Sequence, residues 1–175
     1  MFFIHGYLSS PDGAKGSLLK SSLGIKPIKY RDCEPEDLVI SSCIDEIKKE
    51  LKNISNPILI GSSLGGFLAG KTALTDDIST LILLNPAIMP TDVDITKIDD
   101  MPSRILKDMI DPDLFQKRIQ ARIIIFIGTK DTVVPNRWGI EFAKAQEAEV
   151  HFLDDDHRLS KNLENLPEMI KKVLL

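Results

Sequence analysis

Residues 56–66, NPILIGSSLGG, pass from a short apolar run directly into three glycines and two serines. Residues 61–65, GSSLG, match the pattern G-x-S-x-G at the point where a predicted strand gives way to a predicted helix. The central serine of such a turn has a strained backbone, and side chains two positions away on either side would collide. Gly61 and Gly65 occupy those two positions. The stretch therefore predicts a turn that lifts the Ser63 hydroxyl clear of a sheet, and the alternative is an ordinary glycine-rich connection.

Ser62 is the rival nucleophile in this stretch. The positions two residues away from it are Ile60 and Leu64, which are both bulky. Ser63 is therefore the predicted nucleophile. The amides that follow it at the start of the helix would point toward a developing negative charge.

Short apolar runs alternate with helical patterns along the rest of the chain. Their continuous apolar character is typical of parallel strands that are covered on both faces. The runs span residues 2–4, 57–60, 80–84, 122–127 and 149–153, with a weaker one at 27–30. Helical patterns span residues 40–51, 64–74, 135–147 and 166–174, and Glu36 and Asp37 are placed in the first turn of the first of these. The pattern predicts one α/β domain over residues 1–175, with a mostly parallel sheet of about six strands.

Residues 85–120 interrupt the alternation with four prolines, many aspartates and two short helical patterns. An insertion of this length is too long for a plain crossover turn and predicts a short helical lid over a site. The alternative is a pair of surface helices. Its apolar residues, Met89, Ile105 and Met109 among them, could face the nucleophile or simply pack.

The composition excludes several classes of protein. With 43% hydrophobic and 27% charged residues, the chain is typical of a globular domain. A net charge of −4 without a long basic run argues against nucleic-acid binding. Cys33 and Cys43 are far apart and are predicted to be free thiols in a reducing cytosol, without a zinc site. No apolar stretch approaches the ~20 residues of a membrane span, so we expect a cytoplasmic protein whose oligomeric state stays open.

A serine nucleophile needs a base, and the chain has three histidines. His157 follows the last predicted strand in a loop, and the carboxyl ends of parallel strands are where sites form in open sheets. His151 lies within that strand and should be fixed by the sheet. His5 ends the first strand and is expected to hold the following loop. A loop histidine is often only a solvated surface residue, but the position of His157 makes it the predicted base.

The base needs an orienting acid, and Asp131 follows the strand at 122–127 in the loop GTKDTVVP. A turn cap is the alternative role for Asp131. The acidic run at 154–156 lies next to His157 in sequence, but three consecutive acids are typical of a solvated turn. Asp131 is therefore the predicted partner of His157.

The developing oxyanion needs hydrogen-bond donors. The first strand runs into His5, Gly6 and Tyr7, and Gly6 allows a sharp turn that leaves the Tyr7 amide free. The Leu64 amide, directly after the nucleophile, is the second predicted donor.

Five segments carry a resemblance to a known family. HGYLSSPDGAKG, GSSLGGFLAG, LLNPA, GTKDTVVP and DDDH stand in the order and spacing of the small α/β-hydrolase proteins, and the chain most resembles the short bacterial esterases of the YqiA-like group. The resemblance runs from residue 2 to about residue 159. It implies Ser63 as nucleophile, Asp131 and His157 as its partners, the Tyr7 and Leu64 amides as oxyanion donors, and no metal or organic cofactor.

The sequence departs from that family in two ways. The sequence begins directly on the HG strand, so we expect the first two strands of the larger hydrolases to be missing. Arg158 stands where the group tends to carry a small residue. We expect a hydrolase of small-molecule carboxylic esters that forms an acyl-serine intermediate. The alternatives are a thioesterase, a small-peptide hydrolase, or a hydrolase-like binding protein that has lost catalysis.

Overall fold

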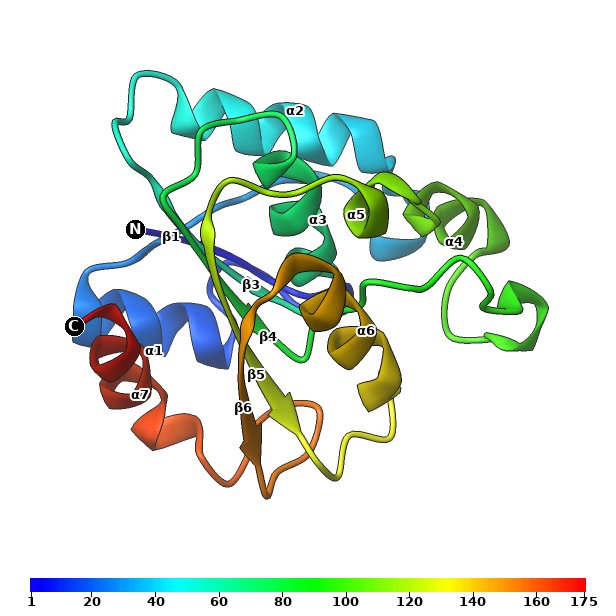
Figure 1. The fold of residues 1–175 in the computed structure, drawn as a ribbon. Coiled ribbons are helices and arrows are strands. Elements are labelled where there is room, and N and C mark those ends of the chain that lie inside the picture. The colour runs from blue at the N-terminus through cyan, green and yellow to red at the C-terminus, as the bar shows by residue number, and fades with distance from the viewer.

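A computed structural model describes residues 1–175. Its six strands are all parallel and form one sheet in the order β2-β1-β3-β4-β5-β6 (Figure 1). The predicted parallel α/β sheet is confirmed. The strands are β1 (Phe2–Ile4), β2 (Lys26–Pro27), β3 (Ile58–Ser62), β4 (Thr80–Leu84), β5 (Arg122–Gly128) and β6 (Glu149–Leu153).

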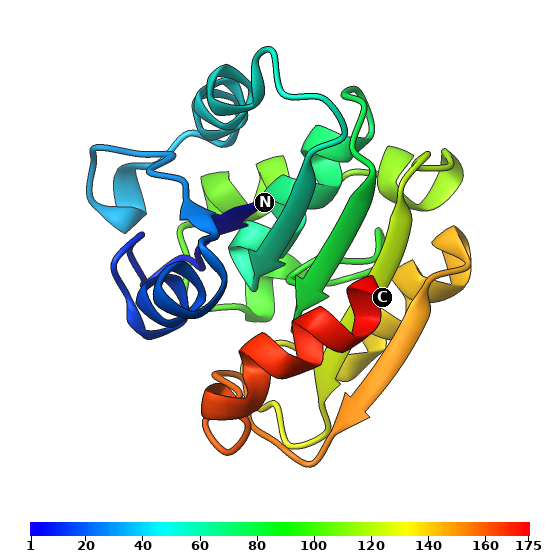
Figure 2. The same cartoon turned by 90° about the vertical axis from the view of Figure 1, so that its left-hand side faces the viewer.

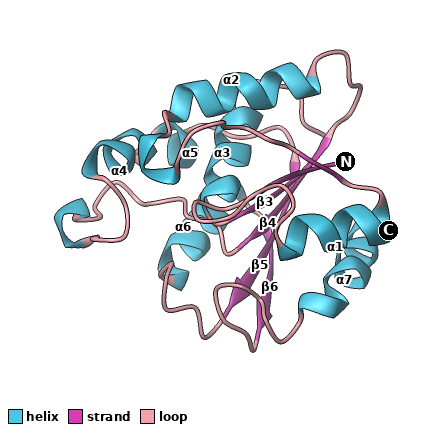
Figure 3. Cartoon of the chain, turned by 180° about the vertical axis from the view of Figure 1, so that it is seen from behind, coloured by secondary structure: helices cyan, strands magenta, loops and turns pink.

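Helices cover both faces of the sheet. Figure 2 shows α7 lying across one face with α1 beside it, and the remaining helices lie on the other face (Figure 3). The α-helices are α1 (Ala14–Leu23), α2 (Ile40–Leu51), α3 (Leu64–Ala73), α4 (Ser103–Met109), α5 (Asp113–Gln116), α6 (Asn136–Gln146) and α7 (Leu166–Leu174). Short 3₁₀ helices are η1 (Pro35–Asp37), η2 (Ile95–Lys97) and η3 (Leu163–Asn165).

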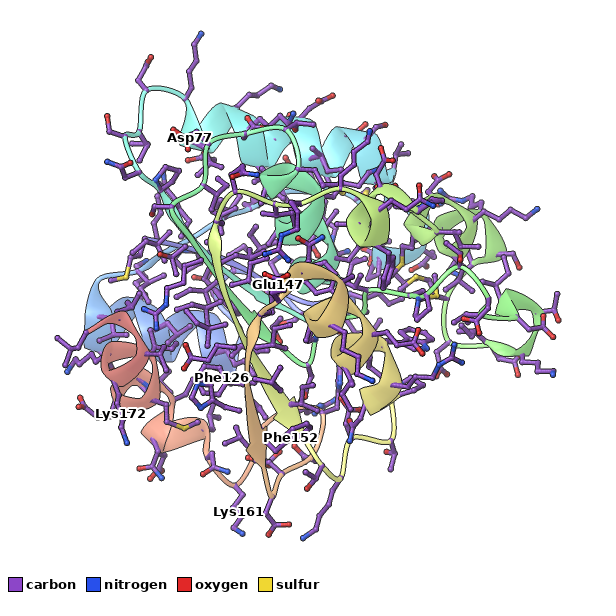
Figure 4. The ribbon with its side chains drawn as sticks, in the orientation of Figure 1. Asp77, Phe126, Glu147, Phe152, Lys161 and Lys172 are labelled. Carbon is purple, nitrogen blue, oxygen red and sulfur yellow. The ribbon has the colours of Figure 1, made fainter.

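The packing of β5 explains why the sequence of this strand is continuously apolar. Ile125 faces the core layer that contains Phe67 of α3, whereas Phe126 faces the layer that contains Leu19 of α1 and Ile170 of α7. Both faces are covered, so successive side chains are buried in opposite layers. Figure 4 marks Phe126 in the middle of the sheet and Lys161 in the loop beyond the arrow ends of β5 and β6.

Two local predictions are wrong. Glu36 and Asp37 belong to η1 and not to the first turn of α2, which begins only at Ile40. The chain is extended at Leu38 because that fully buried side chain turns into the core between the two helices. The weak run at 27–30 overlaps a strand of only two residues at the edge of the sheet. The amides of Lys26 and Ile28 donate to β1, so the Pro27 nitrogen lies on the unpaired side, where proline is tolerated.

The predicted insertion at 85–120 holds η2, α4 and α5, and polar contacts anchor it to the rest of the domain. Lys71 Nζ lies 2.5 Å from the buried Asp111 carboxylate, and the Gln146 side chain donates to two carbonyls at the end of α5. Met89, Ile105 and Met109 are all buried in the core. In this structure these side chains have the packing role, and none of them lines an open surface.

Both cysteines are free, as predicted; Cys33 is exposed and Cys43 is buried. No helix has the length and apolar character that crossing a membrane requires.

Candidate active site

The turn between β3 and α3 places Ser63 in a strained backbone conformation, with φ 55° and ψ −121°. Neighbouring backbone is packed tightly around it. A Cβ on Gly61 would lie 2.4 Å from the Gly65 carbonyl oxygen, and a Cβ on Gly65 would lie 2.1 Å from the Ile4 carbonyl oxygen. No side chain fits at either position, so the turn can close only with glycine. Ser63 is half-buried, whereas Ser62 is buried within the strand.

The loop after β1 runs directly beside this turn. A Cβ on Gly6 would lie 3.2 Å from Ser63 Cβ and 3.8 Å from its Oγ. The amides of Tyr7 and Leu64 donate to no carbonyl or side chain of the protein. The residues that directly follow Gly6 and Ser63 therefore each keep an N–H group without a protein acceptor.

Two residues in the segment that follows β2 hold the loop that carries the Tyr7 amide. The Tyr30 hydroxyl donates to the His5 carbonyl at 3.2 Å, and its ring stacks on the His5 ring at 4.3 Å between centroids. Arg31 Nη2 donates to the carbonyls of Tyr7, at 2.7 Å, and Ser9, at 3.0 Å. These contacts fix the direction of the loop.

His5 is buried, with 2% of its surface exposed, and its Nδ1 lies 2.9 Å from the Gly6 carbonyl oxygen. Burial, helped by the positive charge of Arg31, lowers the pKa of His5 to about 4. The ring is therefore neutral at pH 7. Its contacts are those of a residue that holds the loop.

Asp131 and His157 meet across the loops that follow β5 and β6. Asp131 Oδ2 lies 2.7 Å from His157 Nδ1, and the two side chains are 1% and 18% exposed. The other carboxylate oxygen accepts the amides of Val133 and Val134, each at 2.8 Å. Asp131 thus caps its own turn with one oxygen and binds the imidazole with the other. His157 Nε2 is left free of that contact.

The structure does not join Ser63 to this pair by a hydrogen bond, because Ser63 Oγ contacts no hydrogen-bonding group of the protein. Catalytic hydrogen bonds are often long in free enzymes and shorten only with substrate bound. His151 lies apart from the pair, stacked on Phe126 with its Nε2 2.7 Å from Glu149.

The acidic run beside His157 divides into two environments. Asp154 is exposed, and hydrogen bonds from Lys130 and Lys161 lower its pKa to about 2. Asp155, by contrast, is 3% exposed, and its oxygens accept three backbone amides and the Asn162 side chain. Burial acts to raise the pKa of Asp155, but these hydrogen bonds outweigh it and the pKa is lowered. The predicted solvated turn is therefore wrong for Asp155, because the carboxylate organises the loop from within.

The sequence patterns gave no role to Asn85, Tyr30 or Arg31, although all three lie among the loops at the carboxyl edge of the sheet. Asn85 directly follows the apolar run of β4, and its side chain contacts the loops of both Asp131 and His157. A polar residue at the end of a buried parallel strand is the signal that would have found it.

An open groove of about 650 Å³ lies between the loop that follows β1 and the segment that follows β2. Only two of its twelve lining residues are hydrophobic, and both charges are present, with Lys29 and Arg31 as well as Asp32 and Glu34 in the lining. No group of three or more His, Cys, Asp or Glu side chains is placed to hold a metal ion.

The model of one protein family, described as "Uncharacterised protein family (UPF0227)", matches residues 1–174. The chain belongs to this family. No curated protein matches the sequence.

Several solved structures share the fold at low sequence identity. Est1E from Butyrivibrio proteoclasticus, with ferulic acid bound, has a TM-score of 0.78 at 19% identity, covering 99% of this chain and 86% of that one. The mouse alpha/beta hydrolase domain-containing protein 10 has a TM-score of 0.74 at 20% identity, covering 99% and 88%. The monoacylglycerol lipase of Paleococcus ferrophilus has a TM-score of 0.69 at 15% identity, covering 99% and 92%. These likenesses show that this UPF0227 protein has the α/β-hydrolase fold.

Proposed function

We propose that this protein is a serine hydrolase that cleaves small carboxylic esters through an acyl-serine intermediate. The observation that carries the proposal is the strained turn at Ser63, which has two unpaired amides beside it and glycines where side chains cannot fit. The half-buried Asp131–His157 pair at the same edge of the sheet supplies a base and its orienting acid. The fold likeness to Est1E, which binds ferulic acid, and to a monoacylglycerol lipase supports ester substrates.

In the acylation step, Ser63 Oγ attacks the ester carbonyl carbon while His157 Nε2 takes the hydroxyl proton. The carbonyl oxygen becomes an oxyanion that accepts hydrogen bonds from the Tyr7 and Leu64 amides. When the tetrahedral intermediate collapses, the C–O bond to the alcohol breaks. His157 gives its proton to the departing oxygen, and Asp131 stabilises the imidazolium meanwhile.

In the deacylation step, a water molecule attacks the acyl carbon of the ester on Ser63. His157 takes the water proton, and the same two amides stabilise the second oxyanion. The bond between the acyl carbon and Ser63 Oγ then breaks, and the serine recovers its proton from His157. The products are a carboxylic acid and the free enzyme, and no step needs a metal or an organic cofactor.

In this proposal residues 85–120 form a fixed segment beside the site and do not open and close as a lid. The segment starts at Asn85, beside the proposed site, and is tied down through Asp111 and Gln146. Limited proteolysis within residues 91–102, with and without a bound phosphonate, tests this. Equal cleavage rates are expected, and strong protection by the ligand would show instead a lid that moves.

Labelling with a fluorophosphonate tests the reaction class. We expect stoichiometric attachment to Ser63, loss of attachment in Ser63→Ala, and retention in the matched variant Ser62→Ala. Attachment at residue 62, or no attachment to well-folded protein, would contradict the proposal; the second outcome favours a binding protein. A panel of p-nitrophenyl esters of rising acyl length, with acyl thioesters and short peptides as further arms, then ranks the substrate classes.

A further inference from the structure

Asn85 lies immediately after β4, the strand between the one that leads to Ser63 and the one that leads to Asp131. Its side chain is 3% exposed, and its backbone takes φ 45°. A non-glycine residue with positive φ costs conformational free energy and is kept where the surroundings require it. Nothing in the proposed reaction uses this side chain directly.

The oxygen and the nitrogen of the Asn85 carboxamide both make hydrogen bonds, in the corner where the loop of Asp131 meets the loop of His157. The oxygen accepts the Gly128 amide at 2.7 Å, in the turn that leads to Asp131. The nitrogen donates to the carbonyl oxygens of Asp156, at 3.1 Å, and His157, at 3.0 Å. One side chain therefore links the loop of the acid to the loop of the base.

The backbone around Asn85 connects the same corner to the nucleophile. Ser63 N donates to the carbonyl of Leu84 at 3.0 Å, and the amide of Ala87 donates to the Ser63 carbonyl at 3.0 Å. Residues on both sides of Asn85 are thus hydrogen-bonded to Ser63. The three loops that carry Ser63, Asp131 and His157 share only this segment as a common hydrogen-bonded neighbour.

We propose that Asn85 is a positioning residue that sets the distance of His157 from both Asp131 and Ser63 through its carboxamide. An amide is suited to this role because it both accepts one hydrogen bond and donates two. A carboxylate would turn an oxygen toward two carbonyl oxygens, and an apolar side chain would leave the Gly128 amide and two carbonyls buried without partners. This inference rests on the proposed function.

The test is Asn85→Asp, which preserves the shape and the acceptor for Gly128 but replaces the donor with an oxygen. Asn56→Asp is the matched control, since Asn56 also has positive φ, at 53°, but is exposed and makes no side-chain hydrogen bond. Asn85→Gly is a second variant that removes the carboxamide while tolerating the backbone conformation. Two readouts are taken: kcat/KM per fluorophosphonate-reactive site, and the downfield NMR signal of the His157 ring N–H that faces Asp131.

We expect kcat/KM to fall about 10²-fold in both Asn85 variants, as for a misplacement near 1 Å. The His157 N–H signal should shift or broaden in both, and Asn56→Asp should match the wild type in both readouts. Folded Asn85→Asp with the wild-type rate and signal would overturn the proposal. Loss of near-UV circular dichroism in both Asn85 variants would also overturn it, because the role would then be structural only. If the wild type is not labelled at Ser63, the proposed function fails, whereas the NMR signal still decides whether Asn85 positions His157.

Discussion

The two halves of the proposed site are built by different means. The turn at Ser63 depends on close backbone approach, with glycine required at positions 61 and 65 because neighbouring carbonyl oxygens occupy the space of a side chain. The corner that joins Asp131 to His157 depends on side-chain hydrogen bonds. Those of Asn85 reach residues far away in sequence, whereas those of Asp155 stay within the loop that carries His157. The first half is held by steric constraints and the second by polar contacts.

This difference determines how each half of the site should respond to amino-acid substitutions. A steric constraint between backbone segments has no tolerance, so a single methyl group is enough to break it. A hydrogen-bonded corner should instead lose function or stability in steps, according to which donor or acceptor is removed. Matched substitutions in the two halves therefore separate the two mechanisms.

The largest effect is expected from Gly65→Ala. The added Cβ would lie 2.1 Å from the Ile4 carbonyl oxygen and 2.5 Å from that of His5, so β1 and α3 would have to separate. We expect a loss of about 4 kcal/mol or more in unfolding free energy, or no folded protein.

Gly70→Ala, in the same helix, is the control. Its Cβ would meet only side-chain atoms at 3.4 and 3.5 Å, and stability should change by about 1 kcal/mol or less. Equal urea midpoints for the two variants would contradict the steric account.

The next effect is on catalysis and comes from Asp131→Asn. The amide cannot hold the His157 tautomer as the carboxylate does, so kcat should fall by about 10⁴. Asp156→Asn is the comparison, because the Asp156 carboxylate accepts the backbone amide and hydroxyl of Ser160, at 3.0 and 2.8 Å, rather than the imidazole. It should cost about tenfold or less through the weaker field at His157. If kcat with a p-nitrophenyl ester ranks the two variants the other way, Asp131 is not the orienting acid.

The two halves also differ in how far the sequence predicts them. The glycine spacing around Ser63 is a pattern that five consecutive residues display, and the continuous apolar runs predict a parallel sheet. The partners of Asn85 are set by how loops from different strands meet, and those of Asp155 by the irregular path of its own loop, and no periodicity encodes either. For the same reason three adjacent aspartates suggest a solvated turn, although the middle one is buried. The apolar side chains of 85–120 are ambiguous in sequence, since core packing and substrate contact need the same residue types.

A third effect concerns His5, which lies in the β1 loop beside the nucleophile turn. Its pKa is lowered from the ordinary 6.5 to about 4, so the unfolded chain takes up the proton first as the pH falls. Stability contributed by the neutral ring is complete above pH 6.5 and is lost as the pH falls toward 4. Over that window the loss should amount to about 3 kcal/mol.

His5→Phe isolates this contribution, because the ring can still stack on Tyr30 but cannot titrate. The variant gives up the hydrogen bond to Gly6, which should cost about 1 kcal/mol at pH 7. Urea unfolding of both proteins at pH 7 and pH 4.5 measures the difference, and the variant should lose about 2–3 kcal/mol less than the wild type on acidification. If acidification lowers the unfolding free energy of both proteins equally, protonation of His5 does not cause the loss.

The smallest expected effects are on the unfolding free energy, and they come from substitutions of Asp155 and Asp154 in the loop of His157. They test whether the buried hydrogen bonds of Asp155 stabilise this loop. The Asp155 carboxylate accepts amides of Asp156, Lys161 and Asn162, and the Asn162 side chain, in a site that is 3% exposed. In Asp155→Asn one oxygen becomes a donor that faces other donors, so unfolding should become easier by about 2 kcal/mol. Asp154→Asn removes only exposed ion pairs with Lys130 and Lys161, and its urea midpoint should stay within error of the wild type, since such pairs contribute little.

Raising the salt concentration should leave the difference in unfolding free energy between the two variants unchanged, because hydrogen bonds in a buried site are poorly screened. A gap that closes in salt, or a larger loss in Asp154→Asn, would mean that the net negative charge of the run, rather than the buried hydrogen bonds of Asp155, holds the loop of His157.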